Sequence, residues 1–506
     1  MRSYVVFFTL LTMGGLFVVF QVTGDRAPHK VTVKVEPRVE GDEPDAKERS
    51  ATKGKQEGKQ ASGGKKASGT SGTSKDKPEP KKLEPRMQRP LRVVSLGWEL
   101  IAPGVVANGG ARPDKGSLFS KERLEVHLAA FRTMQEVESA LARGGSDAMG
   151  ADVALVPLPE LVASYERLKA LAPKVFLVLG WSRGRDGLMA STGTSLARLP
   201  RGRIDLVGKA GRSDTFFSLF TLELLGVPVK QVRLIAADDR RAKKAKLSAM
   251  ERPLTTGAPV GDRRFLLTTA DATRLIPMVA VAADGLIKGH QDALAIWGQV
   301  WLAGVEKLQR DVPAAARKVA GLKNAPHALD LLKRLGQIEA APLMDNARLA
   351  GLSGRAPVTL ELLFGRCWQI WRDSGVLSSP IPKPIPVHVG IMSAMVRTYP
   401  ALVEAEPPKA KPGRSRPTGG GSGEAPRLTF KPKVRRWNEQ ELVPQVAFVS
   451  TVFERAQVRV SVRDSVGRAR SLTRTVTQRF DVPTPGRIQP GAHKGDGLIQ
   501  VKITME

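Results

Sequence analysis

Three short stretches combine glycine, hydroxyl and charged residues of the kind that hold a small polar ligand. They read "GWELIAPGVVANGG" at 97–110, "LGWSRGRDGLMAS" at 179–191 and "GKAGRSDTFFSLFTLELLGV" at 208–227. Arginine and serine side chains donate hydrogen bonds to anions, and so do free amides at the start of a helix. The candidate ligand-binding residues are Trp98, Glu99, Asn108, Trp181, Ser182, Arg183, Arg185, Asp186, Ser213, Asp214 and Thr215.

The third stretch predicts a buried helix over 214–225, because phenylalanine and leucine cover most of its surface. Ser213, Asp214 and Thr215 are all good N-cap residues, and Gly226 is suited to end the helix. Two interpretations stay open. These polar residues either form one wall of a ligand site or only cap the helix, and the glycine stretches are then ordinary turns.

Other chemistry has little support in the sequence. The single cysteine, Cys367, lies in the apolar pattern "LLFGRCWQIW" and is expected to be a buried structural thiol. The six histidines are scattered without metal-ligand spacing. No glycine-lysine phosphate loop or nucleophile elbow is present. We therefore expect no metal, no cofactor and no enzymatic activity; Asp186 and Glu223 alone do not make a nucleophile-base pair.

The net charge of +30 raises the question of nucleic acid binding. The excess of lysine and arginine is spread along the chain without one long basic block, and only 3 tyrosines are present. No basic-aromatic stripe suited to stacking bases appears. The pattern argues against nucleic acid and fits a protein close to anionic lipid or cell-wall polymer.

The chain divides into five predicted parts. Residues 1–24 are apolar after Arg2 and are expected to anchor the chain in the bacterial inner membrane as a single span, with the rest periplasmic. A signal peptide cleaved near Val22-Thr23-Gly24 is the alternative. Residues 25–90 read as a disordered basic linker, and 403–426 as a second flexible linker.

Residues 91–402 alternate apolar strands with amphipathic helices, which predicts an α/β fold with a mostly parallel sheet. The expected strands are "RVVSLG", "LEVHLAAF", "VALVPL", "VFLVLGW", "VRLIAA" and "PMVAVAA". The expected helices are 134–143, 214–225, 290–308, 312–320, 325–337 and 358–374. Because loops at the carboxyl ends of strands gather at one crevice, the three polar stretches are expected to meet. Residues 427–506 predict a small β-α-β-α-β module.

Over residues 90–400 the sequence resembles periplasmic solute-binding proteins of the nitrate, sulfonate and taurine transport type. It is similar in particular to membrane-anchored, phosphate-type substrate-binding proteins fused to an OmpA-like domain. The resemblance rests on the first two polar stretches and on "RGGSDAMGADVALVPLPEL", "FLLTTADATRLIP", "DNARLAGLSG" and "CWQIWRDSGVL". It implies a two-lobed, periplasmic binding protein type II-like domain that closes on a small solute, with an ABC permease as partner.

The resemblance carries over unevenly to single residues. Segment 97–108, Ser182 with Gly184 and Asp186, and the helix start at 213–215 match positions that line the cleft in such proteins. "GGSDA" at 144–148 matches a glycine-aspartate turn of the first lobe. Segment 236–264 departs, because relatives place a second such turn and an apolar strand where this chain is highly charged. We expect that segment to be flexible.

The C-terminal module resembles OmpA-like peptidoglycan-binding domains. Asp464 matches the aspartate of their glycine-histidine-threonine-aspartate turn, and Arg468 matches the start of the next helix. Ile499 and Gln500 stand where relatives carry paired arginines. The module therefore either binds peptidoglycan or is a degenerate domain kept for packing or protein contact.

Two functions follow for the whole chain. The first is an envelope-tethered solute-binding protein for a small anion or polar solute, linked to ABC-type uptake or sensing and to the cell wall. The alternative is a structural or assembly protein of the envelope that has lost its ligand and contacts other envelope proteins.

Overall fold

The computed structural model describes residues 84–194, 199, 202–251, 263–400, 403, 428–432, 434, 436–454, 456–482, 488–490 and 499–503. All of them lie in one compact unit, Pro80–Glu506. The expected membrane anchor and most of both expected linkers lie outside the described residues. Within the described part of the chain, no helix has the length and apolar character needed to cross a bilayer.

A six-stranded sheet forms the centre of the first lobe. Its order is β11-β4-β10-β3-β1-β2, where the strands are β1 (Leu91–Leu96), β2 (Val126–Phe131), β3 (Val153–Pro157), β4 (Pro173–Ser182), β10 (Pro277–Ala283) and β11 (Ile338–Ala340). β1 runs parallel to β2 and β3, whereas β10 is antiparallel to β3 and β4, and β11 is antiparallel to β4. The expectation of a mostly parallel sheet is therefore wrong for this lobe. The chain leaves after β4 and returns as β10 in the opposite direction, which makes the sheet mixed.

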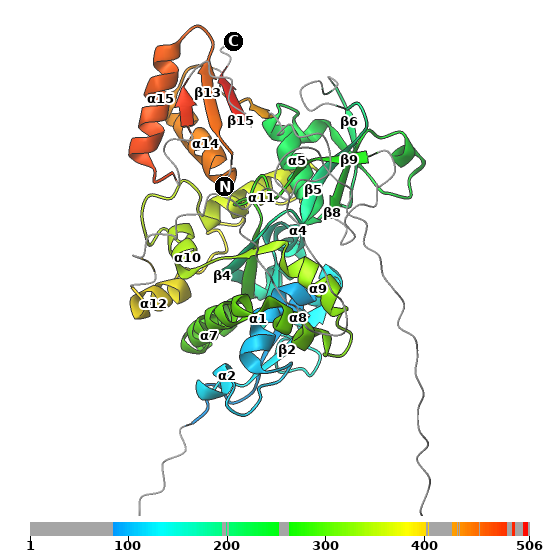
Figure 1. Ribbon diagram of the computed structural model, residues 1–506, viewed down its shortest axis with the longest axis vertical. Helices are drawn as coiled ribbons and strands as arrows, with labels where there is room; N and C mark the ends of the chain where they lie inside the picture. The colour runs from blue at the N-terminus through cyan, green and yellow to red at the C-terminus, as the bar shows by residue number, and fades with distance from the viewer. Residues whose placement is uncertain are drawn as a thin grey trace, which may run out of the picture. The chain divides into compact units, whose positions relative to one another are not determined.

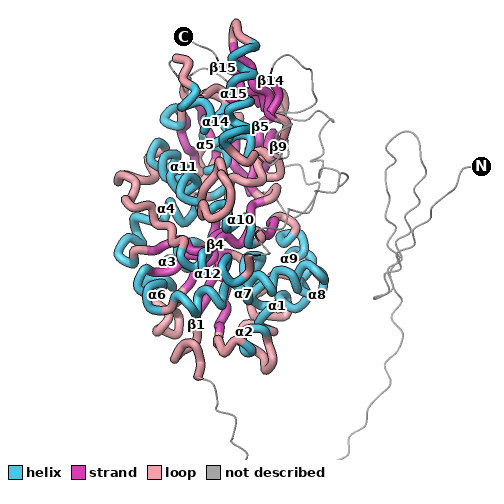
Figure 2. The backbone as a smooth tube through the Cα atoms, turned by 90° about the vertical axis from the view of Figure 1, so that its left-hand side faces the viewer, coloured by secondary structure: helices cyan, strands magenta, loops and turns pink. Residues whose placement is uncertain are grey.

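Helices cover both faces of this sheet, as Figure 2 shows around β1 and β4. They are α1 (Trp98–Asn108), α2 (Leu118–Lys121), α3 (Met134–Arg143), α4 (Leu158–Leu168), α6 (Asp284–Gly289), α7 (Gln291–Arg310), α8 (Val312–Ala320), α9 (Ala328–Leu335), α10 (Leu343–Leu349) and α12 (Gly390–Thr398), with a 3-10 turn at Lys169–Leu171. Glycine lets α1 and α7 pack closely, because a Cβ on Gly304 would lie 2.4 Å from the carbonyl oxygen of Pro103. The stretch expected to be a ligand loop at 97–110 is thus mainly a helix.

A five-stranded sheet forms the second lobe, in the order β7-β6-β8-β5-β9. Its strands are β5 (Asp186–Ser191), β6 (Ile204–Val207), β7 (Val232–Ile235), β8 (Leu247–Glu251) and β9 (Arg263–Thr268), with 3-10 turns at Val229–Gln231 and Arg240–Lys243. The helix α5 (Ser213–Leu224) packs on β5 and β8. β8 corrects the expectation that 236–264 lacks a strand: Leu247 and Ser248 are buried in the sheet despite the charged residues around them.

Two segments connect the lobes, residues 183–185 between β4 and β5 and residues 269–276 between β9 and β10. We call them the crossing segments. The helix α11 (Leu360–Asp373) contacts α4 of the first lobe and α5 of the second. Its Trp371 indole donates a 2.8 Å hydrogen bond to the carbonyl of Pro159, and its ring lies 6.1 Å from that of Phe216.

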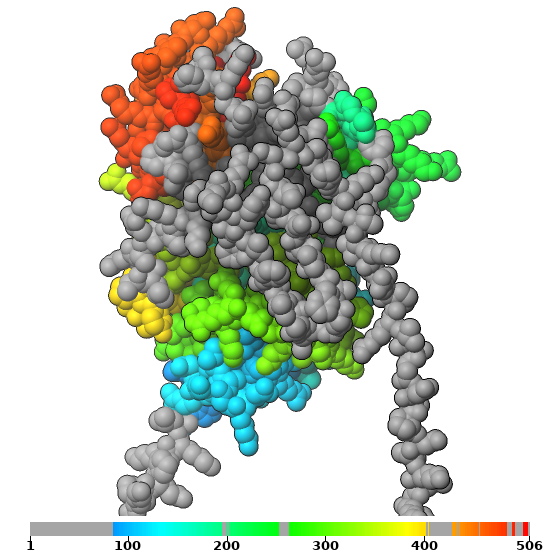
Figure 3. Space-filling model, in the orientation of Figure 1, coloured from blue at the N-terminus to red at the C-terminus, as the bar shows by residue number. Residues whose placement is uncertain are grey.

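The C-terminal module has its own small sheet (Figure 1, orange to red). It runs through β12 (Leu428–Phe430), α14 (Glu439–Val452), β13 (Val458–Val462), α15 (Val466–Arg479), β14 (Ile488–Pro490) and β15 (Ile499–Ile503). The order is β12-β15-β13-β14 and every pairing is parallel. The module follows the predicted β-α-β-α-β order with β14 added, and its orange and red surface is visible in Figure 3.

Candidate functional site

The crossing segments are tied together by a small group of buried hydroxyls. Ser182 donates a 2.6 Å hydrogen bond to Asp186, and its oxygen lies 2.8 Å from the hydroxyl of Thr269. That Thr269 hydroxyl also accepts hydrogen bonds from the amides of Gly184 at 2.9 Å and Asp186 at 3.3 Å. Gly184 has φ +76°, a conformation that favours glycine. The turn that carries Arg183 and Arg185 is therefore held in place by Thr269 of the other crossing segment.

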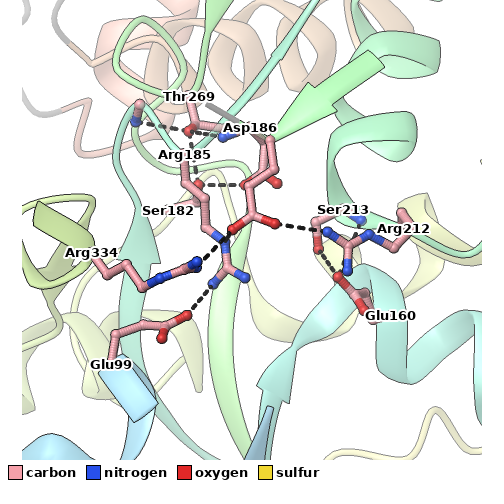
Figure 4. Close-up of polar contacts among 11 residues, drawn as sticks. Glu99, Glu160, Ser182, Arg185, Asp186, Arg212, Ser213, Thr269 and Arg334 are labelled. Atoms are coloured by element: carbon pink, nitrogen blue, oxygen red, sulfur yellow. Dashed lines mark hydrogen bonds and ion pairs between the residues drawn. The ribbon is translucent and has the colours of Figure 1, made fainter. Parts of the chain in front are cut away.

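Arg185 lies between carboxylates from both lobes (Figure 4). Its guanidinium is 3.1 Å from Glu99, at the start of α1, and 3.2 Å from Glu251, at the end of β8. Only 8% of the Arg185 side chain and 4% of the Glu99 side chain are exposed. Burial alone would lower the pKa of Arg185, but Glu99 and Glu251 outweigh it and raise that pKa above its ordinary value. The pair is a charged contact between lobes that is shielded from water.

Glu251 is shared by three arginines. Besides Arg185, it lies 2.8 Å from Arg212, which precedes α5, and 3.4 Å from Arg334 of α9. Burial would raise the pKa of Glu251, but the three arginines together lower it below its ordinary value. Because α9 belongs to the first lobe and β8 to the second, the Arg334 pair is a second charged contact between them.

The helix start predicted as an anion site already faces a carboxylate of this chain. Arg212 is the N-cap residue of α5, so Ser213, Asp214 and Thr215 are its first three residues. The Ser213 amide and hydroxyl donate to Glu160 of α4 at 3.4 and 3.1 Å. Burial raises the pKa of Glu160, against the opposing effect of Arg212, Arg185 and Ser213. The carboxyl group of Glu160 thus lies at the helix start where the sequence analysis expected an anionic ligand.

Asp186 is a buried acid at the end of the first crossing segment. Burial raises its pKa to about 7, although Arg185 and the Ser182 hydrogen bond act in the opposite direction. Near neutral pH its carboxyl group is therefore divided between the charged and the neutral form.

Trp181 and Arg183 lie on the side of β4 that faces β11. The indole of Trp181 donates a 3.2 Å hydrogen bond to Asp345, and Arg274 lies 5.2 Å above its ring. Arg183 is 3.8 Å from Glu339 of β11, and 37% of its side chain is exposed. Trp98 is partly buried at the start of α1. Trp181 and Arg183 therefore contact a second acidic cluster, formed by Glu339 and Asp345.

Asn108 lies apart from this network, whereas the charge of Asp214 acts on Arg212 and Asp186. Asn108 is the last residue of the eleven-residue α1 and donates a 2.9 Å hydrogen bond to the carbonyl of Val126. Glu99 is near the other end of that helix. The carboxylate of Asp214 accepts a 2.7 Å hydrogen bond from the amide of Thr215, within the first turn of α5. These contacts support the local structure.

The two candidate peptidoglycan residues lie close in sequence at the start of α15. Asp464 has φ +62° and an 87% exposed side chain. The Arg468 amide donates to the Ser465 side chain that caps α15, and its guanidinium lies 5.5 Å above the Trp437 ring. Asp464 is therefore open to solvent, and Arg468 rests on an aromatic face.

Five contributors to the site were missed by the sequence analysis: Glu160, Arg212, Glu251, Thr269 and Arg334. Glu160 could have been predicted, because it lies three residues after β3 ends, next to the crevice expected at the carboxyl ends of the strands. Arg334 and Thr269 follow from the tertiary fold alone. Among the described residues, no group of three histidine, cysteine or acidic side chains is placed to hold a metal ion.

No protein-family model matches the sequence, and no curated protein gives a significant match. Solved structures similar to this chain include three periplasmic binding proteins. The putative sulfonate-binding protein SsuA of Methylobacillus flagellatus KT is 13% identical, with 62% of this chain and 96% of that chain covered and a TM-score of 0.42. The nitrate-binding protein NrtA of Synechocystis PCC 6803 is 13% identical, covering 63% and 91%, with a TM-score of 0.41. The aliphatic sulphonate binding protein SsuA of Escherichia coli is 14% identical, covering 58% and 97%, with a TM-score of 0.38.

Proposed function

We propose that this chain is an envelope-tethered solute-binding protein whose two lobes take a small polar solute between them. The observation that carries the proposal is the position of Arg185. It lies on a crossing segment and contacts Glu99 from one lobe and Glu251 from the other. When the lobes separate, the distances from Arg185 to Glu99 and Glu251 change. A solute bound at Arg185 is therefore coupled to lobe movement, as in hinged binding proteins.

A small anion is the favoured solute. Arg185 and Arg212 hold carboxylates in the closed form, and a sulfonate, phosphate or carboxylate group offers the same acceptor oxygens. Such a solute has to take the place of Glu99 or Glu251. Binding is then a competition between two anions for one guanidinium.

Titration calorimetry of the full-length chain with phosphate, sulfate, nitrate, sulfonates and amino acids tests this. We expect one class to give a signal at millimolar concentration or below. Arg185→Ala should weaken binding roughly 10- to 150-fold, because a charge-assisted hydrogen bond is lost. Arg183→Ala should change the affinity little, and Ser213→Ala and Thr215→Ala less than Arg185→Ala.

Glu99→Gln gives the opposite result if the competition is real, because it removes the competing carboxylate while keeping the side chain's shape. The solute should then bind more tightly. No heat signal with any of the solutes, in the parent or in Glu99→Gln, would rule out the proposal.

The alternative, a structural or assembly protein, is favoured by a specific observation. Arg185, Arg212 and Arg334 are each already paired with a carboxylate of the chain itself. On this hypothesis the ion pairs hold the lobes closed permanently. It requires stable protein partners in a cross-linked envelope pulldown together with no solute signal, and a micromolar solute with a clean pulldown would refute it.

The location in the envelope is part of the same proposal. Residues 4–22 should span the inner membrane, with Arg2 on the cytoplasmic side and an ABC permease or another envelope protein as partner. A reporter that is active only in the periplasm should be active when fused after Pro400. Inactivity would overturn export, and a shortened chain released by osmotic shock would indicate cleavage of the N-terminus.

The C-terminal module is proposed to bind peptidoglycan through Asp464 and Arg468. Their location at one end of α15 and the exposure of Asp464 are consistent with this. Co-sedimentation of the full chain with purified peptidoglycan should fall on Asp464→Asn. Equal sedimentation of parent and variant would leave the module as a packing or protein-contact domain.

A further inference from the structure

The C-terminal module contacts the second lobe through α5. The ring of Phe448 on α14 meets the ring of Phe220 edge-on, with centroids 6.2 Å apart. The Lys431 amide, just after β12, donates a 3.2 Å hydrogen bond to the carbonyl of Leu224. The module thus holds both the middle and the end of the helix whose first turn faces Glu160.

The same module contacts the second crossing segment through Arg274. The Arg274 amide donates a 3.2 Å hydrogen bond to the carbonyl of Val452, and its guanidinium lies 3.0 Å from Glu454. Val452 is the last residue of α14, and Glu454 lies two residues after it. Arg274 also lies 3.3 Å from Glu339 and 3.6 Å from Asp345 in the first lobe. Only 18% of the Arg274 side chain is exposed, so solvent screens these pairs weakly.

A third attachment reaches the first lobe. Asp481, after α15, accepts a 3.0 Å hydrogen bond from the Arg355 amide and donates its own amide to the Arg355 carbonyl at 3.3 Å. Arg355 follows α10, which is fixed to the six-stranded sheet because Asn346 exchanges hydrogen bonds with the backbone of Val178 at 2.8 and 2.9 Å. The module is therefore attached to the second lobe, to a crossing segment and to the first lobe.

We infer that the C-terminal module is a clamp that controls how far the two lobes can separate. Lobes that rotate about their crossing segments change the distances among α5, Arg274 and Arg355, and one small domain cannot follow all three. Opening therefore requires that the module release at least one attachment. By linkage, anything that binds the released module also favours open lobes, and a solute that closes the lobes strengthens the docking of the module. The inference rests on the proposed opening and closing of the lobes.

Hydrogen exchange of the full-length chain without added solute tests the clamp. Glu454→Gln removes the charged partner of Arg274, while Glu339 and Asp345 remain to pair with it. We expect amide exchange to rise roughly 3- to 10-fold in residues 269–276 and in 213–215, which face Glu160 from the other lobe. The matched control is Glu441→Gln, on the same helix α14, because Glu441 is exposed and forms no ion pair within the described part of the chain. It should leave both segments unchanged.

A second variant keeps the test decisive if Glu454→Gln fails to fold. Asp481→Asn weakens the attachment to Arg355 at a different point of the module, and Glu441→Gln again serves as the control. Faster exchange at 213–215 in Asp481→Asn supports the clamp. Faster exchange confined to the module, or none, overturns it. Because no solute is used, this outcome is independent of whether any solute binds.

Discussion

The guanidinium of Arg185, on the first crossing segment, lies 3.1 Å from the carboxylate of Glu99 in the first lobe, and both side chains are almost fully buried. Such a pair resists separation, because breaking it leaves charge in a place that water reaches poorly. The observed arrangement of the two lobes is therefore stabilised by the chain's own residues.

The first prediction concerns Glu99→Gln. The variant should lower the free energy of unfolding by about 1–3 kcal/mol, because the buried ion pair loses its negative charge while Glu251 still neutralises Arg185. Urea unfolding followed by circular dichroism measures this. Glu122→Gln is the matched control at the partly exposed Arg86–Glu122 pair, 3.5 Å long, and should cost less than about 1 kcal/mol. Equal losses would mean that the Arg185 pair is no more important than a surface pair.

The second prediction concerns pH and Asp186. Its pKa rises from 3.8 in the unfolded chain to about 7 in the folded one, so the folded state holds this proton more tightly. The associated stability is complete below the unfolded pKa and is lost as pH rises to about 7. Asp186→Asn should therefore lose less stability than the parent between pH 4 and 8, measured by denaturant midpoints.

Asp205→Asn provides a control of opposite sign. Hydrogen bonding to Arg233 lowers the pKa of Asp205, so its contribution is present at neutral pH and lost on acidification. The Asp205→Asn deficit should shrink as pH falls. The same pH dependence in Asp186→Asn as in the parent would contradict a buried, shared proton at Asp186.

The third prediction tests the contact between α1 and α7. Gly304→Ala places a Cβ 2.4 Å from the Pro103 carbonyl oxygen and should destabilise the fold by about 1–3 kcal/mol. Gly285→Ala, on α6 with no atom within 4 Å of the added Cβ, should be neutral or slightly stabilising. Thermal unfolding of the two variants compares them directly, and a neutral Gly304→Ala would show that the helices can move apart at no cost.

The fourth prediction concerns the thiol of Cys367, which is fully buried in α11 and whose pKa burial raises above its ordinary value. A thiol-specific reagent at pH 8 should label the folded chain at least roughly 100-fold more slowly than the denatured chain, because reaction needs an opening of the core. Rapid labelling of the folded protein would show that Cys367 is accessible to solvent, which would contradict the burial of α11.

Many strands and helices of the first lobe were predictable because their apolar residues recur in the sequence at the spacing of a strand or a helix. The predicted helices 134–143 and 312–320 and the strand "PMVAVAA" coincide with α3, α8 and β10. In the second lobe the predicted helix 214–225 and strand "VRLIAA" correspond to α5 and β7, whereas β5, β6, β8 and β9 were not predicted. In β8 and β9 only Leu247, Ser248 and Leu267 are buried, so these strands lack a clear apolar pattern, and their pairing with β5 is decided by distant contacts.

The candidate site was partly predictable for the same physical reason. Arg185, Asp186 and Ser182 lie in one turn, so the sequence placed them together. The partners of Arg185 come from residues 99 and 251, whose distances from it are set only by the tertiary fold. Asn108 was grouped with Glu99 because "GWELIAPGVVANGG" was interpreted as a loop, whereas a helix carries the two residues to opposite ends.

The position of β10 has a consequence for how the chain is made. β10 begins at Pro277 and inserts between β3 and β4, and β4 ends at Ser182. During synthesis the edges of β3 and β4 that later pair with β10 therefore remain unpaired until the whole second lobe has left the ribosome. Exposed edges of this kind invite association with other chains. Correct assembly of the first lobe thus depends on protection of those edges while the second lobe is still being synthesised.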